Sequence, residues 1–121
     1  IYRRKGIGNI SALAIAIKRE LIEKHSISFP EDIRYYADCS FVCNVLYYAK
    51  TFRKVYRSVY IKRKHGDPIN FPSIAQENAP ERFDELIKAF ELSMDSVPAG
   101  STVRTMLDKK FIFYYIIILL L

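Results

Sequence analysis

The stretch Ile33-Arg34-Tyr35-Tyr36-Ala37-Asp38-Cys39-Ser40-Phe41 decides the fold class, because it is the segment that either forms a strand or does not. Its residues alternate as a half-buried strand requires: Tyr35, Ala37, Cys39 and Phe41 alternate with Arg34, Tyr36, Asp38 and Ser40. The residues that follow, up to Tyr48, are apolar and rich in strand-forming types. We therefore predict a strand over Ile33–Phe41.

One helix is predicted before this strand and one after it. Asn9 can open the first, over Ile10–Glu23, because an asparagine side chain caps free backbone N–H groups. The apolar residues of that segment repeat at helical spacing: Ile10, Leu13, Ala14, Ile17 and Leu21. The second helix, over Glu81–Met94, starts behind Pro80. Its stripe consists of Phe83, Leu86, Ile87, Phe90 and Met94. We expect Leu13 and Phe90 to be core residues, and Thr102–Leu107 to begin a further element.

The formal charge of +6 is concentrated in one block. No acidic residue occurs between Ser40 and Gly66, whereas seven cations lie between positions 50 and 64. These candidate contacts to an anionic surface are Lys50, Arg53, Lys54, Arg57, Lys62, Arg63 and Lys64. Because unpaired charges are costly to bury, we expect the block on the surface, with Phe52, Tyr56 and Tyr60 turned inward or toward a membrane. A solvated basic face, an anionic lipid surface and a phosphate backbone remain three alternatives.

The residues that most often carry chemistry form no catalytic or metal-binding pattern in this sequence. Cys39 and Cys43 are compatible with a disulfide, a metal half-site or two ordinary reduced thiols, and the last interpretation is preferred. His25 and His65 lack metal-ligand spacing to these cysteines. His25 suits the end of a helix and His65 a surface turn. We assign no catalytic residue, no metal ligand and no nucleic-acid-binding motif.

The ends of the sequence suggest a piece of a longer protein. The chain starts at Ile1, and Phe111–Leu121 contains only apolar residues and tyrosine. A spanning helix needs about 20 apolar residues, so this tail is half of a membrane segment or sequence that is not native. No secretory signal is visible, and the compartment is left unassigned beyond a membrane-associated, intracellular expectation.

Two stretches resemble the C-terminal domain of the wax ester synthase/diacylglycerol acyltransferase family. The first runs from Asn9 to Leu21 and leads into Ser28-Phe29-Pro30-Glu31-Asp32-Ile33-Arg34. It is similar to the family's buried helix, turn and inner strand, with Asn9 as the helix-opening residue. The second, Asn78–Pro98, is similar to the family's later helix. Ile10 stands where the family usually has Asp, and Asp38-Cys39-Ser40 replaces the usual end of the strand.

The resemblance implies an α/β (α+β) fold in which helices pack on a mixed sheet, as in part of a chloramphenicol-acetyltransferase-like domain. Residues 1–110 would form this domain with a basic insert at about 41–66, followed by the tail at 111–121. The parent enzyme would transfer an acyl group from acyl-CoA, its substrate, without a tightly bound cofactor. The catalytic His-His motif of the family belongs to an N-terminal domain that is missing from this sequence.

Two functions follow. The first is a non-catalytic C-terminal fragment of an O-acyltransferase of wax ester or triacylglycerol synthesis, which alone transfers no acyl group. The alternative is a mostly α fold that serves as a basic, membrane-associated or interaction segment without an enzymatic parent. In both, a solvated face is the preferred interpretation of the basic block; an anionic membrane surface is the candidate partner, and nucleic acid is the less favoured one.

Overall fold

The computed structural model describes residues 12–53, 55–57, 61, 66–67, 69–74, 77 and 79–120, with the backbone alone for 114–120. These residues form the short 3-10 helix η2 (Ala12–Ala14) and the α-helices α2 (Arg19–Lys24), α3 (Asp38–Tyr48), α4 (Glu81–Asp95) and α5 (Thr102–Leu120). No strand occurs in the described part of the chain. The predicted mixed sheet is therefore wrong, and the mostly α alternative fits.

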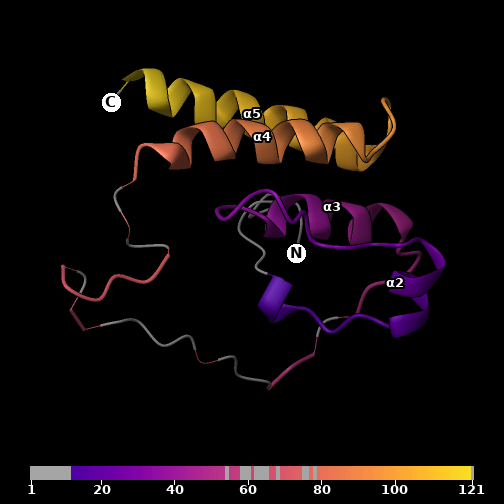
Figure 1. Cartoon of the computed structure of the whole chain (residues 1–121). Helices are drawn as coiled ribbons and strands as arrows, with labels where there is room; N and C mark the ends of the chain where they lie inside the picture. Colours follow the sequence, from indigo (N-terminus) through magenta and orange to yellow (C-terminus); the bar gives the residue numbers. More distant parts are fainter. Residues whose placement is uncertain are drawn as a thin grey trace.

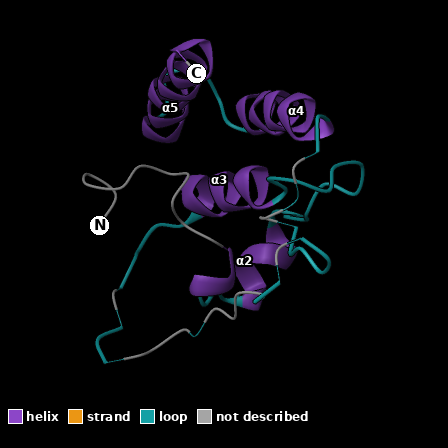
Figure 2. Cartoon of the chain, turned by 90° about the vertical axis from the view of Figure 1, so that its left-hand side faces the viewer, coloured by secondary structure: helices purple, strands orange, loops and turns teal. Residues whose placement is uncertain are grey.

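Helix α3 lies in the middle of the molecule. Figure 1 shows α4 and α5 side by side on one side of it, and α2 lies on the other side. Figure 2, turned by 90° about the vertical axis, shows the same arrangement, with α4 and α5 above α3 and α2 below it. Because α3 has neighbours on both sides, its buried residues are spread around the helix: Ser40, Phe41, Val42, Cys43, Val45 and Leu46. A helix that is buried all round is hydrophobic all round, so its sequence carries little helical periodicity.

This central position explains why Ile33–Phe41 does not form the predicted strand. Only its last four residues, from Asp38, belong to α3, and Ile33–Ala37 form a loop. A short apolar run is compatible with either a buried strand or a buried helix. The strand-forming preference of Val42, Val45 and Phe41 is overridden by packing on both sides of α3. Asp38 in the first turn suits the positive end of the helix.

The predicted continuous helix over Ile10–Glu23 is wrong in its middle. Among its described residues, η2 and α2 are helical, but residues 15–18 between them are not, and Lys18 has an extended backbone with ψ 130°. Leu13 is 70% exposed, so it is not a core residue. Instead, Ile15 and Ile17 alternate with exposed neighbours and pack against the core. Branched isoleucine side chains are less suited to a helix, and residues two positions apart can face the same side where the chain is not helical. Asn9 lies outside the described residues.

Helices α4 and α5 form an antiparallel pair, as Figure 1 shows. The prediction of a helix over Glu81–Met94 is confirmed by α4, and Phe90 is 1% exposed. Between the helices, Gly100 has φ 84°, a left-handed conformation that favours glycine. The Ser101 hydroxyl accepts the Arg104 N–H at 3.1 Å, so Ser101 caps α5. The predicted element at Thr102–Leu107 is the start of this helix.

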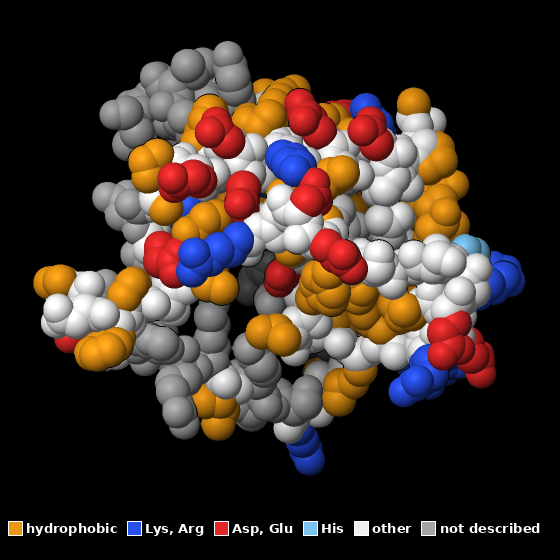
Figure 3. Space-filling model, viewed as in Figure 1, with side chains coloured by type: hydrophobic (Ala, Val, Ile, Leu, Met, Phe, Trp, Pro, Cys, Tyr) orange, Lys and Arg blue, Asp and Glu red, His pale blue; other side chains and the backbone are white. Residues whose placement is uncertain are grey.

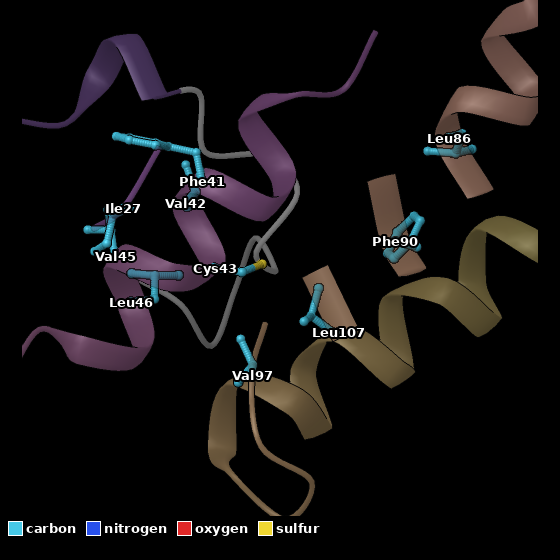
Figure 4. Packing of buried hydrophobic residues seen from close by; sticks show 10 residues of the cluster. All are labelled: Ile27, Phe41, Val42, Cys43, Val45, Leu46, Leu86, Phe90, Val97 and Leu107. Atoms are coloured by element: carbon cyan, nitrogen blue, oxygen red, sulfur yellow. The ribbon is translucent and has the colours of Figure 1, made fainter. Parts of the chain in front are cut away.

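The core lies where the faces of α3, α4 and α5 meet, and it includes Ile27, which lies beside Val45 on the side of α3 away from Phe90 and Leu107 (Figure 4). Phe90 contributes to it from α4, and Leu107 from α5. Phe111 meets the Phe90 ring edge to face, with a centroid distance of 5.3 Å. The first residues of the predicted tail thus continue α5 and contact the core. Among the described residues, no helix is both long and apolar enough to cross a membrane.

Candidate functional site

The start of the predicted basic block leaves α3 as an exposed, irregular segment. Lys50, Arg53 and Arg57 are all exposed. We call the described residues 50–53 and 55–57 the basic segment. Lys54, Lys62, Arg63 and Lys64 belong to the same block by sequence but lie outside the described residues. None of the ion pairs found in the described part of the chain involves a cation of the basic segment.

Large hydrophobic side chains are exposed in the same segment. Phe52 is 55% exposed, Val55 70% and Tyr56 76%. Ile61, further along the connection to α4, is exposed as well. Of the two orientations expected for these aromatic residues, inward or toward a membrane, the inward one is therefore wrong for Phe52 and Tyr56. Tyr60 lies outside the described residues. Cations and apolar groups consequently share one exposed stretch of chain.

Two further exposed hydrophobic residues, Ile69 and Phe71, follow a tight turn at Asp67. The Asp67 carboxylate accepts the backbone N–H groups of Ile69 at 3.1 Å and Asn70 at 3.0 Å. These hydrogen bonds lower the pKa of Asp67, and the one from the Asn70 backbone N–H has the largest effect. The turn presents Ile69 and Phe71 to solvent. Figure 3 shows hydrophobic side chains projecting at this end of the connection, at the left of the view.

The far end of the connection is tied to the helices by Glu77. Its carboxylate accepts hydrogen bonds from the Tyr35 hydroxyl and from Arg34 Nη2, the latter at 2.6 Å. Its carbonyl accepts Arg82 Nη1 at 2.7 Å. The hydrogen bond to the Glu77 carboxylate raises the pKa of the Tyr35 hydroxyl. In the same place, Glu85 accepts the backbone N–H groups of Arg34 and Tyr35. The connection is thus fixed at α3 and again at Glu77.

The contacts of Glu77 with Arg34 and Tyr35 could not be found from the sequence, because they join residues more than 40 positions apart. His25 is closer to expectation, since it ends α2. Its ring stacks on Tyr48 of α3 at a centroid distance of 3.9 Å, which gives it a packing role. His65 lies outside the described residues.

The second candidate site is a group of thiols at the junction of three helices. Cys39 and Cys43 lie one turn apart on α3, Ser93 comes from α4 and Lys110 from α5. Both cysteines are free thiols; Cys43 is fully buried and Cys39 is partly exposed. We call Cys39, Cys43, Ser93 and Lys110 the thiol cluster. In Figure 4 the Cys43 sulfur points to the side of α3 on which Phe90 and Leu107 lie.

The cluster favours a negative charge on Cys39. The pKa of Cys39 is lowered to about 6, mainly by a hydrogen bond with the Cys43 thiol. Ser93 and the charge of Lys110 lower this pKa further, whereas burial and the charge of Asp38 raise it. The same hydrogen bond and burial raise the pKa of Cys43. Burial lowers the pKa of Lys110, although both sulfurs oppose this change.

Comparisons with known proteins give no relatives. No protein-family model, no curated protein and no solved structure matches this chain. Within the described residues, no group of three or more His, Cys, Asp or Glu side chains is placed to hold a metal ion. The function is therefore argued from the two sites themselves.

Proposed function

We propose that this protein binds the surface of anionic membranes through the basic segment. The observation that carries the proposal is the joint exposure of cations and large apolar side chains between Lys50 and Arg57. Cations are attracted to anionic headgroups, and aromatic rings are stable at the interface between headgroups and acyl chains. A stretch that offers both has the chemistry of a peripheral membrane contact.

Electrostatic attraction alone contributes substantially to the free energy of membrane binding. Each cation near an anionic surface contributes about 1 kcal/mol, so Lys50, Arg53 and Arg57 together contribute about 3 kcal/mol. Burial of Phe52 and Tyr56 adds to this, because apolar surface removed from water contributes about 25 cal/mol per Å². Lys54, Lys62, Arg63 and Lys64 are expected to strengthen the attraction by the same physics.

The aliphatic residues favour lipid over nucleic acid as the partner. Arginine and tyrosine suit both partners, since aromatic rings also stack on bases. Val55 and Ile61 do not, because a phosphate backbone offers them no apolar environment. Both are exposed, beside the cations or shortly after them. Ile69 and Phe71 extend the apolar surface further along the same connection.

The helical fold favours the second function over the acyltransferase fragment, which is the first. The resemblance implied helices on a mixed sheet, and the part of the chain that the structure describes contains no strand. Residues 41–48 of the predicted insert belong to the central helix α3. The proposal therefore follows the second function, a basic helical chain that acts at a surface.

Sedimentation with vesicles tests the proposal. We expect the chain to bind vesicles of equimolar phosphatidylserine and phosphatidylcholine, to bind phosphatidylcholine alone weakly, and to lose binding as salt rises. The triple variant Lys50→Glu, Arg53→Glu, Arg57→Glu should lose most of the binding to the anionic vesicles.

The matched control is Lys18→Glu, Arg19→Glu, Lys24→Glu, which reverses three exposed cations in and beside α2, outside the basic segment. Both triple variants lower the formal net charge from +6 to zero. Equal losses in the two variants would show that only net charge matters. Unchanged binding in the first variant would show that the segment is merely a solvated face, and a loss confined to oligonucleotide binding would identify nucleic acid.

A further inference from the structure

The turn over residues 67–71, which we call the Asp67 turn, satisfies its own backbone donors. The Asp67 carboxylate accepts the backbone N–H groups of Ile69 and Asn70, and it accepts the Asn70 side-chain amide at 2.7 Å. The Asp67 carbonyl accepts the N–H of Phe71 at 3.1 Å. Pro68 has no N–H group to satisfy. The backbone N–H groups that follow Asp67 in the turn are therefore bonded without water.

Asp67 gives the turn its shape within an otherwise basic connection. It is the only acidic residue between Asp38 and Glu77. None of the ion pairs in the described part of the chain includes it. Its carboxylate is instead occupied by the three N–H donors of Ile69 and Asn70. A single acid used in this way organises the backbone and holds the side chains of the turn in fixed directions.

The side chains that the Asp67 turn holds outward are large and apolar. Ile69 is 87% exposed, the highest value among the large hydrophobic residues that the structure describes, and Phe71 is 73% exposed. Exposure of such side chains to water is unfavourable, and their transfer to an apolar environment is favourable. A backbone whose N–H groups are already bonded can enter that environment at little cost, because lipid offers no hydrogen-bond partners. Both properties suit a membrane interface.

We propose that the Asp67 turn is a membrane anchor that inserts Ile69 and Phe71 at the boundary between headgroups and acyl chains. The inference rests on the proposed membrane function, and it adds a point of penetration to the electrostatic contact of the basic segment. The turn and the basic segment belong to one connection, whose described parts run outside the packed helices (Figure 1). The cations that precede the turn in sequence, Lys62, Arg63 and Lys64, would lie at the headgroups beside Asp67 and offset its charge.

A double variant of the whole chain measures the apolar contribution. Ile69→Ala with Phe71→Ala should weaken binding to vesicles of equimolar phosphatidylserine and phosphatidylcholine roughly tenfold, because two large side chains lose their burial. The factor should be the same at every salt concentration, since salt screens charges and not apolar burial. The control, Ile112→Ala with Phe83→Ala, removes the same two residue types from α5 and α4, where they are 57% and 43% exposed. It should bind like the wild type.

Two variants of Asp67 test the role of the turn itself. Asp67→Ala and Asp67→Asn remove the same charge, but only asparagine keeps a side-chain oxygen that accepts backbone N–H groups. Asp67→Ala should therefore bind the same vesicles several-fold more weakly than Asp67→Asn. Equal binding of the two variants would overturn the proposed role of the turn.

A tryptophan at position 69 separates this inference from the proposed function. Acyl chains brominated near the middle should quench Ile69→Trp more strongly than Tyr56→Trp. Quenching at position 56 without quenching at position 69 would overturn the anchor and leave the contact of the basic segment intact, whereas a chain that binds no vesicles would overturn both. Loss of self-association in the double variant, with vesicle binding unchanged, would assign Ile69 and Phe71 to a protein contact and overturn the anchor as well.

Discussion

Arg34 and Glu77 form an ion pair with 2.6 Å between Nη2 and Oε1, and this pair joins the loop before α3 to the end of the irregular connection. The Arg34 side chain is largely exposed, so the pair alone contributes little in water. Glu77, however, also accepts the hydroxyl of the buried Tyr35. The carboxylate is thus the common partner of two groups that hold the connection.

Replacing Glu77 should therefore destabilise the fold. Hydrogen bonds to charged groups contribute about 1.5–3 kcal/mol, so Glu77→Ala should lower the free energy of unfolding in urea by about 2 kcal/mol. Glu77→Gln keeps an acceptor for Tyr35 and should cost less. The control is Glu91→Ala, an exposed site on α4, where the change should stay within about 0.5 kcal/mol. If Glu77→Ala behaves like this control, the anchor has no energetic role.

The core should respond very differently at two positions that the sequence ranks alike. Phe90 is 1% exposed and contacts Phe111, so Phe90→Ala should cost about 3–5 kcal/mol. Leu13 is exposed, and Leu13→Ala should change the stability by less than about 0.5 kcal/mol. Both values come from urea unfolding followed by circular dichroism. A large loss at Leu13 would restore the helix predicted over Ile10–Glu23.

Helices α4 and α3 show what the sequence can and cannot reveal. Helix α4 borders solvent on one side, so its apolar stripe repeats every three or four residues and could be predicted. Helix α3 is buried on several sides, and the alternation over Tyr35–Phe41, which covers the loop before α3 and its first turn, indicates a strand equally well. The spacing of Cys39, Val42, Cys43 and Leu46 was the one signal for a helix there.

The candidate sites differ in the same way. The exposed cations of the basic segment were predicted, because a dense run of charge cannot be buried. The exposure of Phe52 and Tyr56 was only one of two alternatives. The thiol cluster could not be predicted, since Ser93 and Lys110 reach Cys39 only through the packing of α4 and α5 on α3.

The reactivity of Cys39 should depend on pH in the range where ordinary thiols are inert. Its pKa is lowered to about 6, first by the hydrogen bond with Cys43. The rate of alkylation by iodoacetamide in the native chain should therefore reach half its plateau near pH 6. In urea the same residue should titrate near its ordinary value of 9.0. Coincident profiles in the two states would show that the cluster does not activate Cys39.

The same shift predicts how stability changes with pH. The folded-state pKa of Cys39 is lower than its unfolded value, so its thiolate contributes stability above 9.0 that disappears as pH falls through about 6. Cys43 acts oppositely above 9.0, because its pKa is raised. Asp38, Ser93 and Lys110 are the other polar or charged groups that act on Cys39.

The free energy of unfolding of the wild type, relative to Cys39→Ser, should therefore rise between about pH 6 and 9. The comparison between the two chains removes the contributions of distant groups. A difference that stays constant across this range would mean that Cys39 is a neutral thiol in the folded protein.

Membrane contact of the basic segment is tested most directly by the fluorescence of a single introduced tryptophan. The sequence contains no tryptophan, so the variant Tyr56→Trp reports on this segment alone. Its control is Phe83→Trp, at a 43% exposed position on α4. With vesicles of equimolar phosphatidylserine and phosphatidylcholine, the emission of Tyr56→Trp should shift to the blue and be quenched by brominated acyl chains, while Phe83→Trp stays unchanged. Vesicle binding without any shift or quenching at position 56, or with equal changes at both positions, would contradict the account.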